Sequence, residues 1–424
     1  MGLLSQSYNE EVKKSKHADL FEKARTPFAY STGLDLLDHM NGKWIDVRGD
    51  KGYYSLGVDE GTYIMLIGKS GTSKTSIALQ MASNIIKGYD EGMIYLDDIE
   101  GATDETRIHN ITKMSYDEID EKVVRRNTGI NCESFYENIS MIARKKEELA
   151  KEYPDEFLIH TGKKDFRGEE IVTMPPTVYI LDSLALLVPA NISEEEQLSG
   201  QMSTTAAAKM NAKIFRQVIP KIKKANIILI AINHITTKIE INPMVHTKAA
   251  VNYMKPDEAV TGGNVPIYLA NNIFKFEAGD KLKDSELYGI NGFTVKVTMI
   301  KSRSNRAGQE GMFVFDQVRG IDNVLTNLLY TKNNKILKGA GVGLYFDGEE
   351  SGTPTKFRLS TFKEKYRANK DFRIFFKKMI LKEYRKMINK VDLDDEMESS
   401  NEETTSEKTS TKKKVTKKKK TTKK

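Results

Sequence analysis

The sequence predicts an α/β protein with a mainly parallel central sheet. Between residues 61 and 316, short apolar runs alternate with longer segments of helical periodicity. This alternation is typical of parallel strands joined by crossover helices. The first apolar run also leads into a glycine-rich turn and then a helix, which is the arrangement of a phosphate-binding loop.

Apolar runs of four to eight residues are the predicted strands, because a buried parallel strand is apolar on both faces. They are Tyr63–Ile67, Met93–Asp97, Val178–Asp182, Ile227–Ile232, Ile273–Phe276, Phe293–Ile300 and Met312–Phe315. Helical spacing predicts helices over Thr75–Ile86, Ser134–Glu152 and Ala206–Lys224. Short loops separate the last strands, which favours an antiparallel extension of the sheet.

The chain divides into four predicted parts. Residues 1–30 hold a charged amphipathic helix that ends near Pro27, and residues 31–320 form the core, entered through a short helix in "YSTGLDLLDHMNG". Residues 321–390 form a small C-terminal domain that ends in a basic amphipathic helix. Residues 391–424 are acidic, then basic, and almost free of apolar residues, so we expect them to be disordered.

The charge of the chain is concentrated in this tail. Residues 408–424 contain ten lysines and no acid, and without them the net charge changes from +7 to −3. The tail is either an electrostatic arm for nucleic acid or a solubilising segment. A single cysteine, Cys132, excludes a disulfide framework, and there is no signal-peptide pattern or membrane-length apolar run. We therefore expect a cytoplasmic protein with no membrane partner.

The segment "LIGKSGTSKT" has glycine, lysine and threonine where a phosphate-binding loop requires them. Backbone N–H groups at the following helix start would hold phosphates, Lys74 would reach the terminal ones, and Thr75 would bind Mg²⁺. Ser73 stands where glycine is usual, and we expect Gly71 to permit the turn. The predicted ATP-binding residues are Gly68, Lys69, Ser70, Gly71, Thr72, Ser73, Lys74 and Thr75. The alternative is a turn that binds no ligand.

Three further strand ends carry polar residues that complete a nucleotide site. Asp182 ends "TVYILD" and is a candidate Mg²⁺ residue with Thr75, or else the start of a turn. "MIYLDDIEGAT" offers Asp97, Asp98 and Glu100, one of which would orient the attacking water while the others cap or face solvent. "IILIAINHITTK" ends in an Asn-His pair, and His234 would sense the γ-phosphate.

With these pieces in order, the chain resembles the RecA family of homologous-recombination ATPases, and most closely its phage branch. The resemblance runs from about Tyr30 to Phe346 and includes "YSTGLDLLD", "YILDSLALL", "VTGGNVPIYLANNIFKF" and "VTMIKSRS". It implies a RecA-like P-loop core and makes Ser73 a variation of that branch. In the family the catalytic glutamate lies two residues after a strand-end aspartate. Counting from Asp97, we choose Glu100 with a one-residue bulge, and Asp98 second.

The resemblance also implies two DNA-binding loops, at about residues 191–205 and 236–263. Their lysines would neutralise phosphates, and Met or Tyr would stack on or wedge between bases. The implied DNA-binding residues are Met202, Lys209, Lys238, Lys248, Tyr253, Lys255, Gly262 and Gly263. Two cations in "KSR", Lys301 and Arg303, would reach the ATP of a neighbouring subunit and stabilise transition-state charge.

These implications predict an ATP- and Mg²⁺-dependent recombinase. It would form helical homo-oligomeric filaments on single-stranded DNA and pair them with double-stranded DNA, with single-strand-binding and loader proteins as further partners. A phage-encoded protein would act in the host cytoplasm. The alternatives are a hexameric helicase with a RecA core and an accessory DNA-binding ATPase without strand exchange.

Overall fold

The computed structural model describes residues 25–190, 201–237, 251–282, 291–339, 343–346 and 355–388, with the side chains of residues 201–206 excepted. Nearly all of the predicted N-terminal helix and the whole predicted tail lie outside these ranges. Residues 25–28 are described, and they are not helical.

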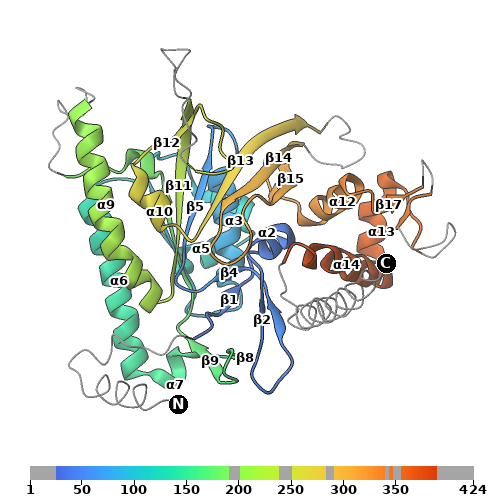
Figure 1. Cartoon of the computed structure of the whole chain (residues 1–424), viewed down its shortest axis with the longest axis horizontal. Helices are drawn as coiled ribbons and strands as arrows, with labels where there is room; N and C mark the ends of the chain where they lie inside the picture. The colour runs from blue at the N-terminus through green and yellow to red at the C-terminus, as the bar shows by residue number, and fades with distance from the viewer. Residues whose placement is uncertain are drawn as a thin grey trace, which may run out of the picture. The chain divides into compact units, whose positions relative to one another are not determined.

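A central sheet carries the fold (Figure 1), and its strand order is β16-β15-β14-β13-β5-β11-β10-β6-β7, with β12 paired to β11. Its strands are β5 (Tyr63–Gly68), β6 (Met93–Asp98), β7 (Val123–Arg126), β10 (Thr177–Asp182), β11 (Ile227–Thr237), β12 (Glu258–Val260), β13 (Asn272–Lys281), β14 (Gly292–Lys301), β15 (Glu310–Asp316) and β16 (Gly320–Ile321).

The middle of the sheet is parallel, from β13 through β5, β11, β10 and β6 to β7. Strands β14, β15 and β16 continue it in antiparallel pairing beyond β13. The predicted α/β class, the mainly parallel sheet and its antiparallel extension are therefore confirmed. Because parallel strands share one direction, the polar residues at the carboxyl ends of β5, β6, β10 and β11 meet at one edge.

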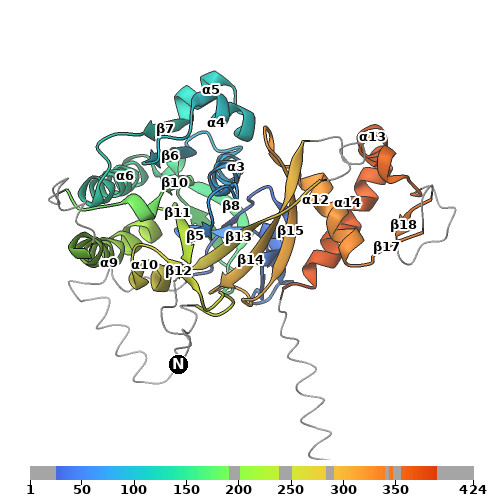
Figure 2. The same cartoon turned by 90° about the horizontal axis from the view of Figure 1, so that it is seen from above.

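The helices that the structure describes cover both faces of the sheet (Figure 2). They are α2 (Asp35–Met40), α3 (Lys74–Ile86), α4 (Glu105–Thr112), α5 (Tyr116–Lys122), α6 (Cys132–Glu152), α7 (Pro154–Phe157), α9 (Gln201–Lys224), α10 (Asn264–Leu269), α12 (Asn323–Asn333), α13 (Phe362–Ala368) and α14 (Lys370–Arg385). Short 3₁₀ turns, η2 and η3, occupy Leu184–Leu186 and Leu359–Thr361.

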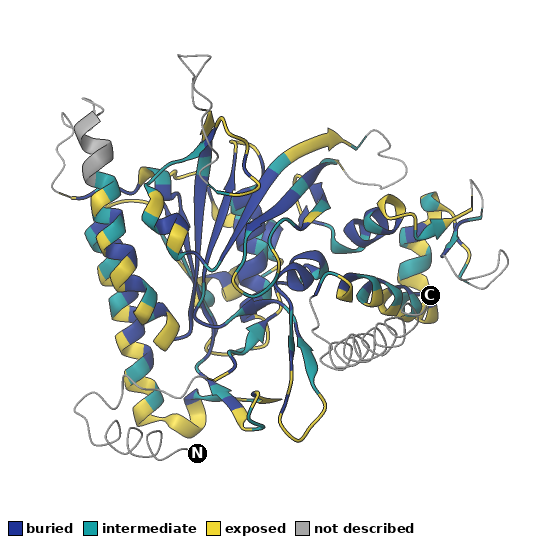
Figure 3. Ribbon diagram, viewed as in Figure 1, coloured by how far each residue is buried: buried dark blue, intermediate teal, exposed yellow. Residues whose placement is uncertain are grey.

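Alternate residues of β5 face two different hydrophobic clusters, as the two-residue period of a strand requires. Ile64 and Leu66 pack with α3 in one cluster, whereas Met65 and Ile67 pack with α6, α9 and α10 in the other. The sheet is therefore buried on both faces, which Figure 3 shows as dark blue strands between half-exposed helices. This burial explains why the parallel strands are apolar throughout.

The C-terminal helices are continuous with this core. Leu328 of α12 and Phe376 of α14 belong to the same hydrophobic cluster as Leu66, and residues 321–388 fall within one compact unit with the preceding chain. The predicted basic helix is α14, and its buried residues recur at helical spacing. A short pair, β17 (Leu337–Lys338) and β18 (Tyr345–Phe346), lies beside it.

Three small pairs of strands were not predicted. They are β1 (Ala29–Tyr30) with β4 (Val58–Asp59), β2 (Lys43–Ile45) with β3 (Tyr53–Ser55), and β8 (Ile159–Lys164) with β9 (Glu170–Thr173). Trp44 of β2 packs edge-on against Tyr54 at 4.8 Å, and the Arg385 guanidinium at the end of α14 lies over the Tyr54 ring. None of the helices among the described residues is both long and apolar enough to cross a bilayer.

Candidate active site

The glycine-rich loop connects the end of β5 to the start of α3, as the sequence predicted. Gly68 leaves no room for a side chain, because a Cβ would lie 2.5 Å from the carbonyl oxygen of Phe276 on β13. Gly71 has open space around it but adopts φ +77°, a conformation that favours glycine. The two glycines therefore serve different purposes, close strand packing at one and a left-handed turn at the other.

Ser73 also adopts the left-handed conformation, with φ +64°. Gly71 adopts the left-handed turn that was expected of it, and Ser73 adds a second left-handed residue that was not predicted. The Ser73 side chain makes no capping hydrogen bond to α3. A non-glycine residue held in this region costs about 1–2 kcal/mol, so the surrounding loop and helix must impose the conformation. Serine thus adopts the backbone shape for which glycine is usual at this position.

The ammonium group of Lys74 lies inside the loop. It is only 5% exposed, and Nζ donates to the carbonyl oxygens of Gly68 at 3.1 Å and Lys69 at 2.9 Å. Burial lowers the pKa of Lys74, and the nearby carboxylates of Asp182 and Glu100 oppose this shift. The loop therefore encloses a cation that is bonded to backbone carbonyls and to no carboxylate.

Thr75 and Asp182 meet at the edge of the sheet. The Thr75 hydroxyl donates to a carboxylate oxygen of Asp182 at 2.5 Å. Burial raises the pKa of Asp182 to about 6, and the negative charges of Glu100 and Asp98 add to this effect against the Thr75 hydrogen bond. Acidic groups are thus crowded beside a hydroxyl, an environment that a divalent cation would stabilise.

The three acids at the end of β6 have different surroundings. Asp97 accepts two hydrogen bonds of 2.8 Å from Arg126 on β7, so its carboxylate is held in an ion pair. Asp98 accepts from the backbone N–H groups of Ala102 and Thr103 and thereby fixes the turn after the strand. Of the three, Glu100 is the one whose carboxylate is neither ion-paired to arginine nor bonded to backbone.

The structure corrects the assumed bulge before Glu100. Strand β6 pairs with β10 in unbroken register as far as Asp98, which lies opposite Asp182. The strand-end aspartate is therefore Asp98, and Glu100 lies two residues after it without any bulge. The sequence count started one residue too early, because a strand of six residues was taken to have five.

The side chain of Glu100 contacts that of His234, which lies near the carboxyl end of β11 beyond β10. Glu100 Oε1 and His234 Nε2 are 2.8 Å apart, and both side chains are about one-third exposed, at 34% and 28%. Partial burial raises the pKa of Glu100, but the His234 hydrogen bond and the charges of His234 and Lys74 outweigh it, so the pKa is lowered. Because His234 is in register with Gly68, this pair lies beside the loop.

Asn233 connects the same strand end to a later segment. It is fully buried, its side-chain amide donates to the carbonyl oxygen of Thr261 at 2.8 Å, and its side-chain oxygen accepts from the Thr261 hydroxyl at 2.7 Å. Thr261 directly precedes Gly262 and Gly263, which both have positive φ. A change at the end of β11 can therefore reach the end of the second predicted loop through one side chain.

The side chains of Lys301 and Arg303 share one hydrogen-bond acceptor, which is a backbone carbonyl oxygen. Both donate to the Tyr268 carbonyl oxygen at the end of α10, at 2.6 Å and 2.8 Å. Burial and the Arg303 charge lower the pKa of Lys301 to about 8. Lys301 is in register with Ile273, which pairs with Met65, three residues before Gly68. Both cations thus lie away from the end of β5 where their own loop begins.

The predicted DNA-binding residues are described in part. Lys238, Lys248 and the side chain of Met202 lie outside the described residues. Lys209 is exposed on α9, and Tyr253 is 59% exposed with φ +67°.

The other described members of the second loop lie near its end. Lys255 is 3.6 Å from the Glu277 carboxylate. A Cβ on Gly262 or Gly263 would lie 3.3 Å from Leu184 or 3.1 Å from Ala208, so this segment packs closely against η2 and α9.

Arg107 is a residue of the site that the sequence analysis missed. From α4 its guanidinium donates to the Ser76 hydroxyl at 2.6 Å and to the Gln317 carbonyl oxygen at 2.5 Å. It therefore places a planar cation beside the first turn of α3, next to Thr75. No linear pattern identifies it, because its partners lie 31 and 210 residues away in the chain.

The sequence matches no model of a known protein family. Among the described residues there is also no group of three or more His, Cys, Asp or Glu side chains that would hold a metal ion by themselves. Any metal at Thr75 and Asp182 would need further ligands from a nucleotide or from water, which is how phosphate-binding loops hold Mg²⁺.

Proposed function

We propose that this protein is an ATP-dependent DNA recombinase with a RecA-like core, which forms filaments on single-stranded DNA and promotes homologous pairing and strand exchange. The observation that carries the proposal is the arrangement at the carboxyl edge of the parallel sheet. There a phosphate-binding loop, a Thr75–Asp182 pair and a Glu100–His234 pair lie together, and Asn233 leads from them to the second predicted DNA-binding loop.

The residues of the loop fit ATP with Mg²⁺. Lys74 is buried among carbonyl oxygens that a phosphate oxygen would replace as acceptor, and the N-terminus of α3 favours an anion. The Thr75 hydroxyl would bind Mg²⁺ directly and Asp182 would hold it through water. The raised pKa of Asp182 supports this assignment, because a cation would relieve the crowding of acids around it. Bound Mg²⁺ would neutralise charge on the phosphates.

Glu100 is the proposed catalytic carboxylate, and its role would be to orient the attacking water. The lowered pKa keeps its carboxylate ionised at neutral pH, as an acceptor of a water proton must be. His234 holds the carboxylate from the end of β11, on the other side of β10. Because the neighbouring acids are occupied by Arg126 and by backbone N–H groups, they are less suited to this task.

The same strand end would link the nucleotide to DNA. His234 would contact the γ-phosphate, and Asn233 would transmit a shift of β11 to Thr261 and the glycines after it. The proposed DNA contacts are Met202, Lys209, Lys238, Lys248, Tyr253, Lys255, Gly262 and Gly263. Loss of the γ-phosphate would then loosen the DNA loops and weaken DNA binding.

Lys301 and Arg303 are proposed to act on the ATP of a neighbouring subunit. Their position away from the end of β5 supports a role at the ATP of another subunit. Both side chains donate to the carbonyl oxygen of Tyr268, so the two cations are held close to each other. Such a head-to-tail interface propagates into a filament. Each cation would stabilise transition-state charge as arginine fingers do.

Electron microscopy with single-stranded DNA and a non-hydrolysable ATP analogue tests the assembly. Extended helical filaments are expected, together with joint-molecule formation when homologous duplex DNA and ATP are supplied. Closed rings would indicate a hexameric motor instead. Filaments that hydrolyse ATP but never form joint molecules would indicate an accessory ATPase.

Mixing two inactive variants tests the shared site. Arg303→Ala should lose up to ~10³-fold of DNA-stimulated hydrolysis while each subunit still binds ATP. The Lys74→Met subunit keeps Lys301 and Arg303 but lacks the lysine of its own ATP-binding loop. Some interfaces in a mixed filament would pair an intact loop with an intact Arg303, so part of the activity should return. If mixed filaments form and no activity returns, the two cations do not act in trans.

A further inference from the structure

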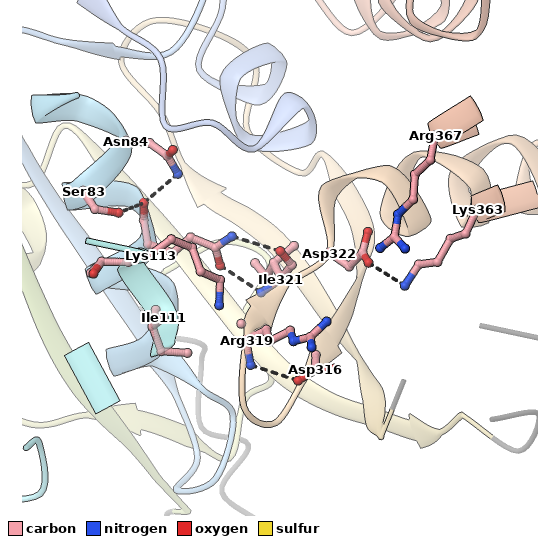
Figure 4. Close-up of a pocket in the computed structure, with 13 residues that line it drawn as sticks. Ser83, Asn84, Ile111, Lys113, Asp316, Arg319, Ile321, Asp322, Lys363 and Arg367 are labelled. Carbon is pink, nitrogen blue, oxygen red and sulfur yellow. Dashed lines mark hydrogen bonds and ion pairs between the residues drawn. The ribbon is translucent and has the colours of Figure 1, made fainter. Parts of the chain in front are cut away.

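A polar cavity of about 260 Å³ lies beside Gln80, Ser83 and Asn84 of α3 (Figure 4). Its walls come from α3, the end of α4, the β15–β16 turn and α13. The lining residues are Gln80, Ser83, Asn84, Ile111, Thr112, Lys113, Asp316, Arg319, Gly320, Ile321, Asp322, Lys363 and Arg367. None of them belongs to the nucleotide site described above.

The two acids in this cavity are already occupied. Asp322 forms an ion pair of 3.0 Å with Lys363. One oxygen of Asp316 accepts the backbone N–H groups of Val318 and Arg319, each at 2.9 Å. Asp316 therefore holds the β15–β16 turn in shape, and Asp322 neutralises one of the four cations.

The other three cations lack a carboxylate partner. In the described part of the chain, Lys113, Arg319 and Arg367 have no carboxylate oxygen within 4.0 Å, and Lys113 donates only to the carbonyl oxygen of Asn110. They come from three different elements, as Figure 4 shows. Burial lowers the pKa of Lys113, the positive charge of Arg319 lowers it further, and the negative charge of Asp316 opposes the shift. Four cations against two carboxylates leave a positive balance in the lining.

The wall that presents Arg319 is rigidly attached to α3. The Gln80 side chain accepts from the Ile321 N–H at 2.8 Å and donates to the Ile321 carbonyl oxygen at 2.9 Å. Gly320 has φ +83°, and a Cβ there would lie 2.7 Å from the Gln80 side-chain oxygen. These contacts fix the position of the β15–β16 turn against α3, so the backbone of Arg319 is held in place before any ligand binds.

The lining carries four cations and two carboxylates, a net charge of +2, which favours a ligand with more than one negative charge. A carboxylate or a phosphodiester brings a single charge, whereas a phosphomonoester carries about −1.5 to −2 at neutral pH and has three strong acceptor oxygens. Arginine pairs such oxygens through two parallel N–H groups. Ser83 and Thr112 add hydroxyl groups to the lining.

We propose that this cavity is a second anion site, which binds a dianionic phosphate group through Lys113, Arg319 and Arg367. The group can be inorganic phosphate, the terminal phosphate of a nucleotide or the 5′-phosphate of a nucleic acid end, because all three share this chemistry. Ser83 lies eight residues beyond Thr75, which is about 12 Å along the helix, so the site is separate from the phosphate loop. The proposal does not depend on the recombinase assignment.

The cavity is nevertheless connected to the nucleotide site. Gln317, in the turn that carries Arg319, accepts from Arg107, which also donates to Ser76. The same fixed turn therefore carries Arg319 at the cavity and accepts the hydrogen bond of Arg107, which contacts the first turn of α3.

Isothermal titration of the full-length Lys74→Met protein with inorganic phosphate tests the site, because this variant removes the loop cation. We expect one phosphate per chain, and binding about tenfold weaker in each of Lys74→Met/Arg319→Ala and Lys74→Met/Arg367→Ala, since each change removes a charge-assisted hydrogen bond. Arg358→Ala in the same background is the matched control, because Arg358 is an exposed arginine that does not line the cavity.

Sulfate should bind with similar affinity and formate much more weakly, because the site selects a dianion. Titrations with ATP and with oligonucleotides that carry a 5′-phosphate or a 5′-hydroxyl then identify the source of the group. The proposal is overturned if phosphate does not bind the Lys74→Met protein, or if the Arg319 and Arg367 variants bind it like the control. Binding of an acidic peptide in place of phosphate would likewise overturn it.

Discussion

Two buried lysines lie at opposite ends of the same sheet. Lys74 is 5% exposed at the carboxyl end of β5, and Lys146 of α6 is 7% exposed near the amino ends of β10 and β11. Lys146 Nζ donates to the carbonyl oxygens of Pro175 and Asn226 and to the Thr177 hydroxyl, at 2.6, 3.0 and 2.9 Å. Both ammonium groups therefore bond mainly to backbone carbonyls.

The difference lies in the charges around them. Burial lowers the pKa of Lys146 to about 7, and no carboxylate opposes the shift. Around Lys74 the carboxylates of Asp182 and Glu100 do oppose it, and the backbone that accepts its hydrogen bonds is a loop with two left-handed residues. A buried lysine therefore does not identify a site by itself. The nearby carboxylates, and loop carbonyl oxygens that a ligand could replace as acceptors, distinguish Lys74 from a lysine that joins strand ends.

Substitution of the two lysines by methionine should separate the two roles most strongly. Lys74→Met should reduce ATP binding below detection, because it removes the point charge on the β- and γ-phosphates. Its thermal unfolding should stay close to that of the wild type, since carbonyls of an open loop can turn to water. Fluorescent-nucleotide titration and calorimetry measure both. Normal nucleotide affinity would contradict the loop assignment.

Substitutions of the acids near Lys74 should differ in their effect on ATP turnover. Glu100→Gln should lower ATP turnover by about 10²–10⁴-fold and leave nucleotide binding intact, because the amide cannot accept the proton of the attacking water. Asp98→Asn is the comparison, and we expect it to affect the turn after β6 more than the chemistry. Steady-state hydrolysis assays decide the matter. If Asp98→Asn stops turnover and Glu100→Gln does not, the roles are exchanged.

Lys146→Met should leave nucleotide binding unchanged and lower the free energy of unfolding by about 2–4 kcal/mol, because three buried acceptors lose their donor. The wild-type pKa near 7 is below the ordinary value for lysine, so the folded state releases this proton above about pH 7 while the unfolded state keeps it to about pH 10. The stability that Lys146 contributes should therefore grow as pH rises from about 7 toward 10. Urea titrations at several pH values test this, and a pH-independent difference would refute the buried neutral form.

Asp182→Asn should change stability less than Lys146→Met does, and in the opposite direction. The folded-state pKa near 6 lies above the ordinary aspartate value, so the ionised side chain destabilises the fold at neutral pH. Without nucleotide, the variant should be about 1–2 kcal/mol more stable at pH 8. This gain should shrink as pH falls through 6 and disappear below about 3.8, where the wild-type carboxyl is protonated in both states. A variant less stable at pH 8 would show that the Thr75 hydrogen bond outweighs the crowding of acids.

The central strands were predictable because both of their faces are buried and their sequences are therefore apolar throughout. Strand β7, "VVRR", escaped prediction because it is short and half polar, and because its pairing with β6 depends on the fold. The loop and Asp182 were recognisable from local patterns. The environments of Asp97, Asp98 and Arg107 were not, because their partners come from β7, a following turn and β15–β16. The pairing of β6 with β10, which makes Asp98 the strand-end aspartate two residues before Glu100, likewise depends on the folded sheet.

The hairpin of β2 and β3 gives the protein an optical reporter. Trp44 is the only tryptophan in the chain, and its ring meets Tyr54, which in turn lies under the guanidinium of Arg385 from α14. Indole emission can be excited apart from tyrosine and responds to solvent and to nearby charge. The unlabelled protein thus reports by its own fluorescence whether the last helix remains seated against the hairpin. Nucleotide at the far edge of the sheet would change that signal only if its binding displaces α14.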